Sequence, residues 1–165
     1  MEILGKTYYE TPLGLVEISA TARGLYSLKF VESPEEEIDP ANPYLQECME
    51  QLEEYFQGER MLFNLMIDLA GTEFQNQVWR ELQNIPFAQT RSYMKVAKNI
   101  QSPDAVRAVG NACGKNRLWL VVPCHRVISS DGKLTGYAGG LARKRWLLEH
   151  ERGVIYGKQT LLFND

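Results

Sequence analysis

The sequence predicts a two-part chain, in which an α+β region, residues 1–70, is followed by a mainly helical region, residues 71–165. Two observations support this. Apolar residues alternate with polar ones early in the chain, as in half-buried strands, whereas after Gly71 they recur at helical spacing. The 165 residues, 44% hydrophobic and 24% charged, suffice for one ordinary domain or two small ones, and they exclude disordered and fibrous proteins.

Three strands are expected early in the first region. Residues 16–20 alternate between apolar and polar side chains, and residues 25–31 form a second apolar run after Gly24. Together these runs predict a β-hairpin. We interpret residues 6–11 as a third strand.

A helix and another strand should complete this region. After an acidic, proline-punctuated loop at 34–43, apolar residues at helical spacing predict a helix over 45–56, which ends at Gly58. Residues 61–69 predict a further strand. Cys48 lies on the apolar stripe of the helix, so we interpret it as a core residue.

The second region begins with clear helix signals. Thr72 and Gln75 have the spacing of a capping box, and the apolar face that follows ends at Pro86. A short helix is expected over 93–99, after Ser92.

A third helix is expected over 103–113, because Ser102, Pro103 and Asp104 have the order of an N-cap, a first-turn proline and an acidic residue near the positive helix end. Two short helices in succession, the second carrying Arg107, resemble a DNA-binding helix-turn-helix. The second helix has a face of small residues, namely Ala105, Ala108, Gly110 and Ala112. Short helix pairs with alanine faces are also ordinary packing devices, so this motif alone leaves DNA binding open.

The apolar run at 118–122 predicts a buried strand that leads directly to Cys124, His125 and Arg126. A base and a cation beside a cysteine lower the pKa of its thiol, so Cys124 is the candidate nucleophile. Burial alone acts in the opposite direction, and a reactive thiol therefore needs a proton acceptor held by a third group.

Glu149 and Glu151, on a helix that begins near Leu141, are the acidic candidates for that third group. From spacing alone, Cys124 is equally interpretable as a structural core thiol with an exposed His125.

Charge is divided unevenly along the chain. Residues 1–70 carry 4 Lys/Arg against 14 Asp/Glu, and residues 71–165 carry 14 against 7, which gives balances of −10 and +7. A basic half can neutralise phosphates and release their counterions, so this asymmetry favours a polyanionic partner for the second region. The alternative is a chance distribution of surface charge.

Three cysteines and no export signal predict free thiols in a cytoplasmic protein, and no apolar run is long enough to cross a membrane. Two histidines without clustered cysteines predict no metal site. No cofactor is expected either.

The active-site segment carries a family resemblance. Pro-Cys-His-Arg-Val at 123–127 is preceded by Arg-Ala-Val-Gly at 107–110 and Asn116, and is followed by Gly-Tyr-Ala-Gly-Gly at 136–140. This pattern resembles the O6-alkylguanine-DNA alkyltransferase family, also called methylated-DNA–protein-cysteine methyltransferases, of bacterial type. The resemblance covers about residues 71–152, and the first half matches only in general character.

The resemblance implies an N-terminal ribonuclease-H-like antiparallel sheet with a helix, residues 1–70, and a mainly helical winged-helix domain for DNA binding and alkyl transfer, residues 71–165. It also implies direct damage reversal, in which a cysteine takes an alkyl group from O6 of guanine, or less readily O4 of thymine. Because the thioether is not hydrolysed, each molecule acts once. The implied partner is double-stranded DNA that contains O6-alkylguanine, bound by a monomer.

Four catalytic residues follow from the resemblance. Cys124 is the alkyl acceptor, and His125 is the base that deprotonates it through a water molecule. Glu151 orients that histidine, because its spacing from Trp146 selects it over Glu149. Asn116 matches the hinge asparagine of the family.

Other residues match positions that handle DNA. Tyr93 resembles the tyrosine that crowds the 3′ phosphate, promotes nucleotide rotation and donates to the leaving base. Arg107 resembles the arginine that fills the vacated space in the stack. The expected DNA-contacting set is completed by Ser92, Ala105, Ala108, Gly110 and Lys115.

The substrate pocket is expected to include Val127, Tyr137, Ala138, Trp119 and Lys144. Ala138 stands where many relatives have serine, but the backbone N–H that faces O6 is unaffected. Trp119 stands where a small residue or proline is usual, and either restricts the pocket or turns into the core. Ala88 occupies a position at which glycine is common. Cys113 is interpreted as a packing residue.

Two other functions remain as alternatives. A cysteine hydrolase would use the same Cys-His-Glu arrangement on an acyl group, but it would need an oxyanion hole. A non-catalytic DNA-lesion-binding module would share the helix-turn-helix, although the presence of Cys124 argues against it.

Overall fold

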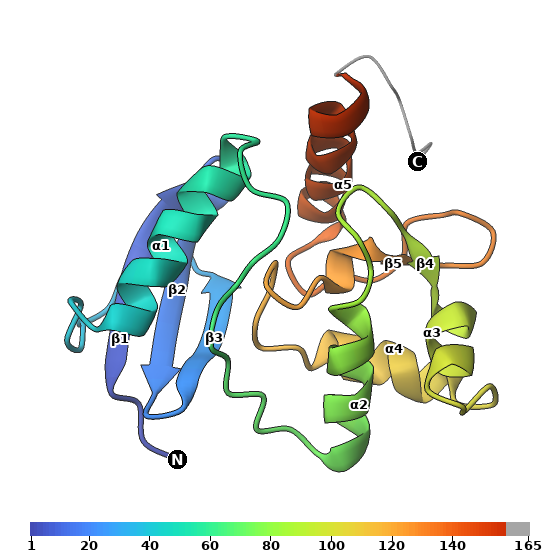
Figure 1. Ribbon diagram of the computed structural model, residues 1–165, viewed down its shortest axis with the longest axis horizontal. Coiled ribbons are helices and arrows are strands. Elements are labelled where there is room, and N and C mark those ends of the chain that lie inside the picture. Colours follow the sequence, from blue (N-terminus) through green and yellow to red (C-terminus); the bar gives the residue numbers. More distant parts are fainter. Residues whose placement is uncertain (158–165) are drawn as a thin grey trace. The chain divides into compact units, whose positions relative to one another are not determined.

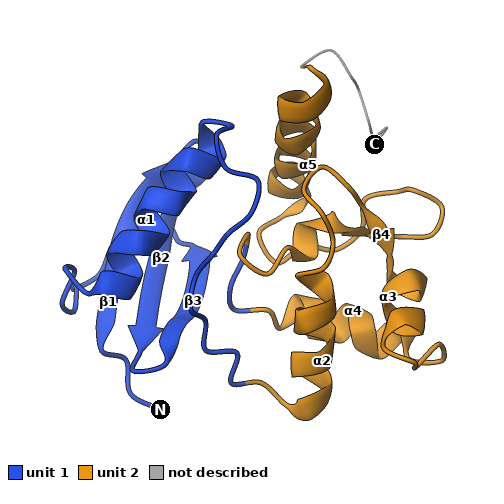
Figure 2. Cartoon of the chain, viewed as in Figure 1, with its two compact units in different colours: residues 1–70, 117–119 blue, residues 71–116, 120–165 orange. Residues whose placement is uncertain are grey.

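The computed structural model describes residues 1–157 and divides them into two compact units (Figure 2). Unit 1 contains residues 1–70 and 117–119. Unit 2 contains residues 71–116 and the described residues from 120 onward. The chain thus returns briefly to unit 1 just before the candidate nucleophile, a feature that the sequence pattern does not reveal.

Unit 1 is a three-stranded antiparallel sheet in the order β1–β2–β3, with helix α1 across one face (Figure 1). The elements are β1 (Gly5–Thr11), β2 (Gly14–Thr21), β3 (Gly24–Phe30) and α1 (Pro43–Phe56). This confirms the predicted hairpin and third strand. The side chains that β2 and β3 contribute to the core include Val16, Ile18, Leu25 and Leu28, all fully buried.

Helix α1 begins two residues earlier than predicted. Asn42 caps it by accepting a hydrogen bond from the Tyr44 N–H at 2.9 Å, and Pro43 occupies the first turn, where its missing N–H costs nothing. Cys48 is fully buried in the apolar stripe of α1, as predicted.

The predicted strand over 61–69 is wrong. These residues make one isolated bridge, between Ile67 and Leu25 of β3. The Gln51 side chain instead donates to the Asn64 carbonyl at 3.0 Å and accepts from the Asn64 N–H at 2.9 Å. Because a side chain satisfies this backbone, a strand ladder does not extend through it.

Unit 2 is mainly helical, with α2 packed against α3 and α4 (Figure 1). Its helices are α2 (Glu73–Leu82), α3 (Tyr93–Asn99), α4 (Val106–Gly114), the 3₁₀ turn η1 (Cys124–Arg126) and α5 (Leu141–Tyr156). Two short strands, β4 (Arg91–Ser92) and β5 (Val127–Ile128), pair in parallel. The capping box of Thr72 and Gln75 is present as predicted.

Helix α4 begins at Val106, three residues later than predicted. The Ala105 N–H bonds the Ser102 carbonyl at 2.9 Å, which closes a turn, and α4 has no side-chain cap. Residues 102–105, which have the sequence pattern of a helix start, therefore form a turn before α4.

The predicted strand over 118–122 is also wrong. Leu118 makes a single bridge to β3, and Leu120 adopts a positive φ of 75°, which breaks an extended backbone. Leu118, Leu120 and Val122 are nevertheless buried. The apolar run therefore predicts burial correctly but not strand.

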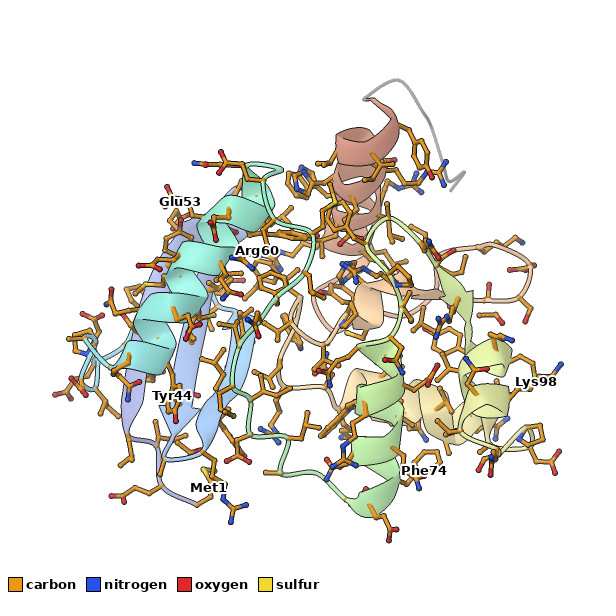
Figure 3. The ribbon with its side chains drawn as sticks, in the orientation of Figure 1. Met1, Tyr44, Glu53, Arg60, Phe74 and Lys98 are labelled. Atoms are coloured by element: carbon orange, nitrogen blue, oxygen red, sulfur yellow. The ribbon has the colours of Figure 1, made fainter. Side chains whose placement is uncertain are left out.

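The exposed charged side chains Glu53 on α1 and Lys98 on α3 point outward from their units (Figure 3). Within residues 1–157, no helix combines the length and the apolar character that a membrane span needs.

Candidate active site

A cavity of about 130 Å³ adjoins Cys124 in unit 2. Its walls come from α3, α4, the start of η1 and the segment that follows β5. The lining residues are Tyr93, Gly110, Cys113, Gly114, Cys124, Gly136, Tyr137 and Ala138. Cys124 is only 5% exposed, so a reaction partner must enter this cavity to reach its sulfur.

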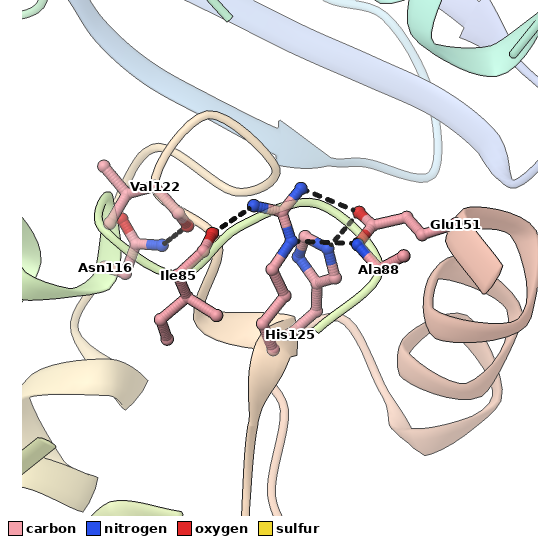
Figure 4. Close-up of polar contacts among 7 residues, drawn as sticks. Ile85, Ala88, Asn116, Val122, His125 and Glu151 are labelled. Carbon is pink, nitrogen blue, oxygen red and sulfur yellow. Dashed lines mark hydrogen bonds and ion pairs between the residues drawn. The ribbon is translucent and has the colours of Figure 1, made fainter. Parts of the chain in front are cut away.

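Asn116 holds the active-site turn and contacts the thiol. Its Nδ2 donates to the Val122 carbonyl at 2.9 Å (Figure 4) and to Cys124 Sγ at 3.2 Å. Burial raises the pKa of the Cys124 thiol, and the Asn116 hydrogen bond and the Lys144 charge offset this only in part. The thiol therefore keeps its proton at neutral pH until a base removes it.

His125 and Glu151 are fully buried, and His125 Nε2 lies 2.8 Å from Glu151 Oε2 (Figure 4). Arg126 donates from Nε and Nη2 to the same carboxylate at 2.9 and 3.0 Å, and from Nη1 to the Ile85 carbonyl at 2.8 Å. The Ala88 N–H adds a bond to Glu151 Oε1 at 3.1 Å. The carboxylate is thus held from both sides, and it in turn holds the imidazole.

The protonation states of this cluster follow from its contacts. Burial acts to raise the pKa of Glu151, but the charges and hydrogen bonds of His125 and Arg126 outweigh it, so the pKa lies well below its ordinary value. Since an ionised carboxylate only accepts hydrogen bonds, His125 Nε2 carries the hydrogen.

His125 is poised as a base. Its Nδ1 is buried and has no hydrogen-bond partner among residues 1–157. Burial lowers the pKa of His125, although Glu151 partly opposes this, so the imidazole is neutral at pH 7. A neutral imidazole with a free Nδ1 lone pair can accept a proton.

Lys144 supports the segment that lines the cavity. Its fully buried Nζ donates to the carbonyls of Val127, Thr135 and Gly136 at 2.6, 2.8 and 3.2 Å. Neither Lys144 nor Val127 is among the residues that line this cavity, and their expected contact with the substrate stays a prediction. The three carbonyls occupy the ammonium group, which therefore faces backbone.

Two tyrosines form the aromatic part of the wall. Tyr93, the first residue of α3, donates from its hydroxyl to the Thr135 carbonyl at 3.4 Å. Tyr137 and Ala138 follow directly on the segment that Lys144 holds. The resemblance implies that Tyr93 crowds a DNA phosphate, which stays a prediction, and the structure places Tyr93 in the cavity wall.

The α3–α4 region carries the residues expected to contact DNA. Arg107, Ala108 and Lys115 are exposed, whereas Ala105 and Gly110 are half-buried. The Ser92 hydroxyl accepts from the Lys95 N–H at 3.0 Å and caps α3.

Trp119 lies in unit 1 and is not among the residues that line the cavity, so of its two expected placements the structure favours packing within its own unit over restriction of the pocket. Its ring centroid is 5.9 Å from that of Phe30, and its backbone N–H donates to the Leu28 carbonyl at 3.0 Å. This backbone pairing fixes the segment along β3.

Sequence reasoning missed the contribution of two residues. Arg126 was assigned to the thiol as a nearby cation, but its guanidinium pairs with Glu151. Cys113 was assigned to packing, yet it lines the cavity. The spacing of Gly110, Cys113 and Gly114 is the signal available for the second, because residues three and four apart share a helix face.

Glu149, the alternative acid, pairs instead with Arg145 at 3.9 Å.

Comparison with known proteins accounts for both parts of the chain. Residues 4–69 match the family model of the 6-O-methylguanine DNA methyltransferase ribonuclease-like domain, and residues 73–153 match that of the DNA-binding domain. The chain is 46% identical to a methylated-DNA–protein-cysteine methyltransferase of Mycolicibacterium paratuberculosis, over 87% of this chain and 89% of the relative. A relative of the same name from Methanosarcina acetivorans is 42% identical, over 87% and 95%.

Solved structures agree with this assignment. The crystal structure of Mycobacterium tuberculosis OGT in complex with DNA is similar with a TM-score of 0.82 at 41% identity, covering 89% of this chain and 92% of that one. The same organism's O6-methylguanine methyltransferase gives 0.79 at 40% identity, covering 90% and 92%. On two matching domains and extensive identity, the chain belongs to the 6-O-methylguanine DNA methyltransferase family.

Proposed function

We propose that this protein repairs DNA by direct reversal, in which Cys124 takes an alkyl group from O6 of guanine in double-stranded DNA, and less readily from O4 of thymine. One arrangement carries the proposal. The buried Cys124 thiol lies at the cavity and accepts a hydrogen bond from Asn116, and the next residue, His125, is paired with Glu151. The relatives are named as methyltransferases that act between methylated DNA and a protein cysteine, and the M. tuberculosis OGT was crystallised in complex with DNA.

The transfer is a single displacement at carbon. His125 Nδ1 takes the thiol proton of Cys124 through a water molecule, and Glu151 stabilises the imidazolium that results. The thiolate then attacks the alkyl carbon, the C–O6 bond breaks and its electron pair remains on O6. Tyr93 supplies a proton to the leaving guanine and is reprotonated from solvent, to which the His125 imidazolium returns the thiol proton. The thioether persists, so each molecule acts once and needs no cofactor.

The lesion must leave the base stack before the sulfur can reach it. In this account, α3 and α4 are the helix-turn-helix of a winged-helix domain, and the small residues Ala105, Ala108 and Gly110 allow α4 to approach the minor groove. Extrusion costs a few kcal/mol, less for a poorly paired base. Arg107 fills the vacated space and Tyr93 crowds the 3′ phosphate, which offset part of this cost.

The remaining site residues position DNA and substrate. Ser92 and Lys115 contact the phosphate backbone, which supplies affinity without sequence preference. The Ala138 N–H faces O6, on the segment that Lys144 holds through its carbonyl contacts. Action as a monomer in the cytoplasm stays a prediction.

Intact mass spectrometry tests the proposal. Incubation with duplex DNA that contains O6-methylguanine should add one CH₂ to the protein, and the gain should persist. Cys124→Ser should show no gain while it retains DNA binding, since affinity comes mainly from phosphate contacts. Release of the added group would favour a hydrolase, and DNA binding without any gain would favour a lesion-binding module.

A further inference from the structure

Cys113 stands out among the side chains around the cavity. Four of the eight described lining residues are glycine or alanine, and two are tyrosines. Besides the nucleophile, this leaves Cys113 as the one lining side chain of intermediate size. It is 8% exposed, at the end of α4.

The wall that α4 provides is fixed in place. The buried Trp79 of α2 donates from Nε1 to the Ala112 carbonyl at 2.9 Å, directly before Cys113. In a close-packed interior such a wall does not retreat to make room for a larger guest. A Cβ added at Gly110 or Gly114 would meet no atom within 4 Å, so neighbouring positions on α4 leave open space.

The Cys113 thiol supplies bulk rather than a second nucleophile. Burial raises its pKa to about 12, so it stays protonated at neutral pH. Alkyl transfer to this sulfur is therefore not expected, although it lines the same cavity as Cys124.

We infer that Cys113 determines how large an alkyl group the site accepts. The inference rests on the proposed function and deepens it. A group bulkier than methyl would press against the Cys113 side chain, because α4 is held by Trp79 and the aromatic walls are held through Tyr93 and the Lys144-bound segment.

The test compares single-turnover rates on two duplexes that differ only in the lesion, O6-methylguanine or O6-benzylguanine. The measured quantity is the ratio of the benzyl rate to the methyl rate, in which shared costs of binding and base extrusion cancel. A single methylene in a pocket typically changes discrimination by 10-fold or more, so Cys113→Ala should raise this ratio by about 10-fold. Cys113→Leu should lower it by about 10-fold or more.

Two controls separate volume from other effects. Cys113→Thr removes the thiol but keeps a side-chain volume close to that of cysteine, so it should leave the ratio within about twofold of the wild type. Cys48→Ala removes a buried thiol from unit 1 and should also leave the ratio unchanged. Thermal unfolding checks that each variant is folded, and the smaller Cys113→Ala keeps the test decisive if Cys113→Leu does not fold.

The outcomes distinguish this inference from the proposed function. Equal ratios in the wild type, Cys113→Ala and Cys113→Leu would overturn the size-limiting role, as would a shift in Cys113→Thr as large as that in Cys113→Ala. A wild-type protein that takes neither group would instead refute the proposed function.

Discussion

At the scale of single residues, Glu151 links His125, the proton-accepting residue of the site, to Arg126 and to the backbone of Ala88. It accepts hydrogen bonds from His125, Arg126 and the Ala88 N–H at once. Its charge opposes the effect of burial on the pKa of His125. Glu151 therefore sets both the orientation of the imidazole and the pH range in which it acts as a base.

Glu151→Gln should slow alkyl transfer by about 100-fold, because His125 becomes a weaker and less well-oriented base. The pH profile provides a second readout. Wild-type activity should fall as the pH drops below the pKa of His125, which lies below its ordinary 6.5. Without the carboxylate this pKa falls further, so the acid limb of the single-turnover rate should move to lower pH.

The matched control is Glu149→Gln, on the same helix but paired with Arg145. It should leave the pH profile unchanged. Removing one member of a buried ion pair costs about 3–5 kcal/mol, so circular dichroism must show that Glu151→Gln is folded at the assay temperature. An acid limb that stays in place would argue that Glu151 serves stability alone.

The backbone of Ala88 is strained, which agrees with the resemblance, since glycine is common at this position. It has a positive φ of 66°, a region that disfavours a side chain, and its N–H bonds Glu151. Ala88→Gly should therefore raise the free energy of unfolding by up to about 1 kcal/mol, the strain relief being partly offset by a more flexible unfolded chain. Urea unfolding measures the change.

Ala142→Gly is the opposite case, because Ala142 lies within α5. There glycine should destabilise by about 1 kcal/mol. Similar losses in the two variants would show that Ala88 is not strained.

At the scale of elements, the sequence predicted the starts of α2 and α3, which side-chain caps fix, but it overpredicted strands in two apolar segments. The capping box at Thr72 and the cap at Ser92 lie where the sequence indicates, since each is satisfied by residues within one turn. The segments 61–69 and 118–122 are apolar but not strands, because a Gln51 side chain and the positive φ of Leu120 decide their backbones. A long-range side-chain contact or a single positive φ does not change the apolar periodicity of a segment, so the sequence pattern does not reveal it.

Helix α4 has a proposed role that kinetics can isolate. Arg107 is exposed on the first turn of α4, and in the proposed function it stabilises the extruded state, a requirement that a free base never meets. Arg107→Ala should therefore reduce the repair rate in duplex DNA by about 10-fold or more, since the arginine offsets a few kcal/mol of unstacking. Its rate on free O6-methylguanine should change little.

Lys98→Ala, which removes an exposed charge from neighbouring α3, is the matched control and should not show this selectivity. Equal losses of the Arg107 variant on duplex and free base would place Arg107 in chemistry or stability instead.

At the scale of the whole molecule, charge separates along the chain. Residues 1–70 carry 14 acidic and 4 basic side chains, whereas residues 71–165 carry 7 and 14. DNA affinity should therefore fall steeply with salt, and its slope should depend on residues of the second region. Lys115→Ala should reduce the slope of log K against log salt by about one, the value for one lost phosphate contact.

Lys29→Ala, in β3 of unit 1, should leave the slope unchanged. Fluorescence anisotropy at several salt concentrations measures both variants. A change in slope for Lys29 but not Lys115 would reverse the assignment of the DNA-binding region.

The sequence predicted the reactive residues of the site better than it predicted the residues that line the cavity. Cys124, His125 and Asn116 lie within a short segment whose motif is specific, and Glu151 follows from one more spacing. The cavity walls depend on tertiary packing. Trp119 returns to unit 1, Lys144 turns to three carbonyls, and Cys113 faces the cavity. No local pattern distinguishes these outcomes.

The most direct test of the central claim is a titration of the protein with excess duplex that contains O6-methylguanine, followed by peptide mapping. Repaired guanine should reach one equivalent per protein molecule and stop. The added methyl group should lie on the peptide that contains Cys124, with Cys48 and Cys113 unmodified. Continued turnover beyond one equivalent, or a methyl group on any other residue, would contradict the account.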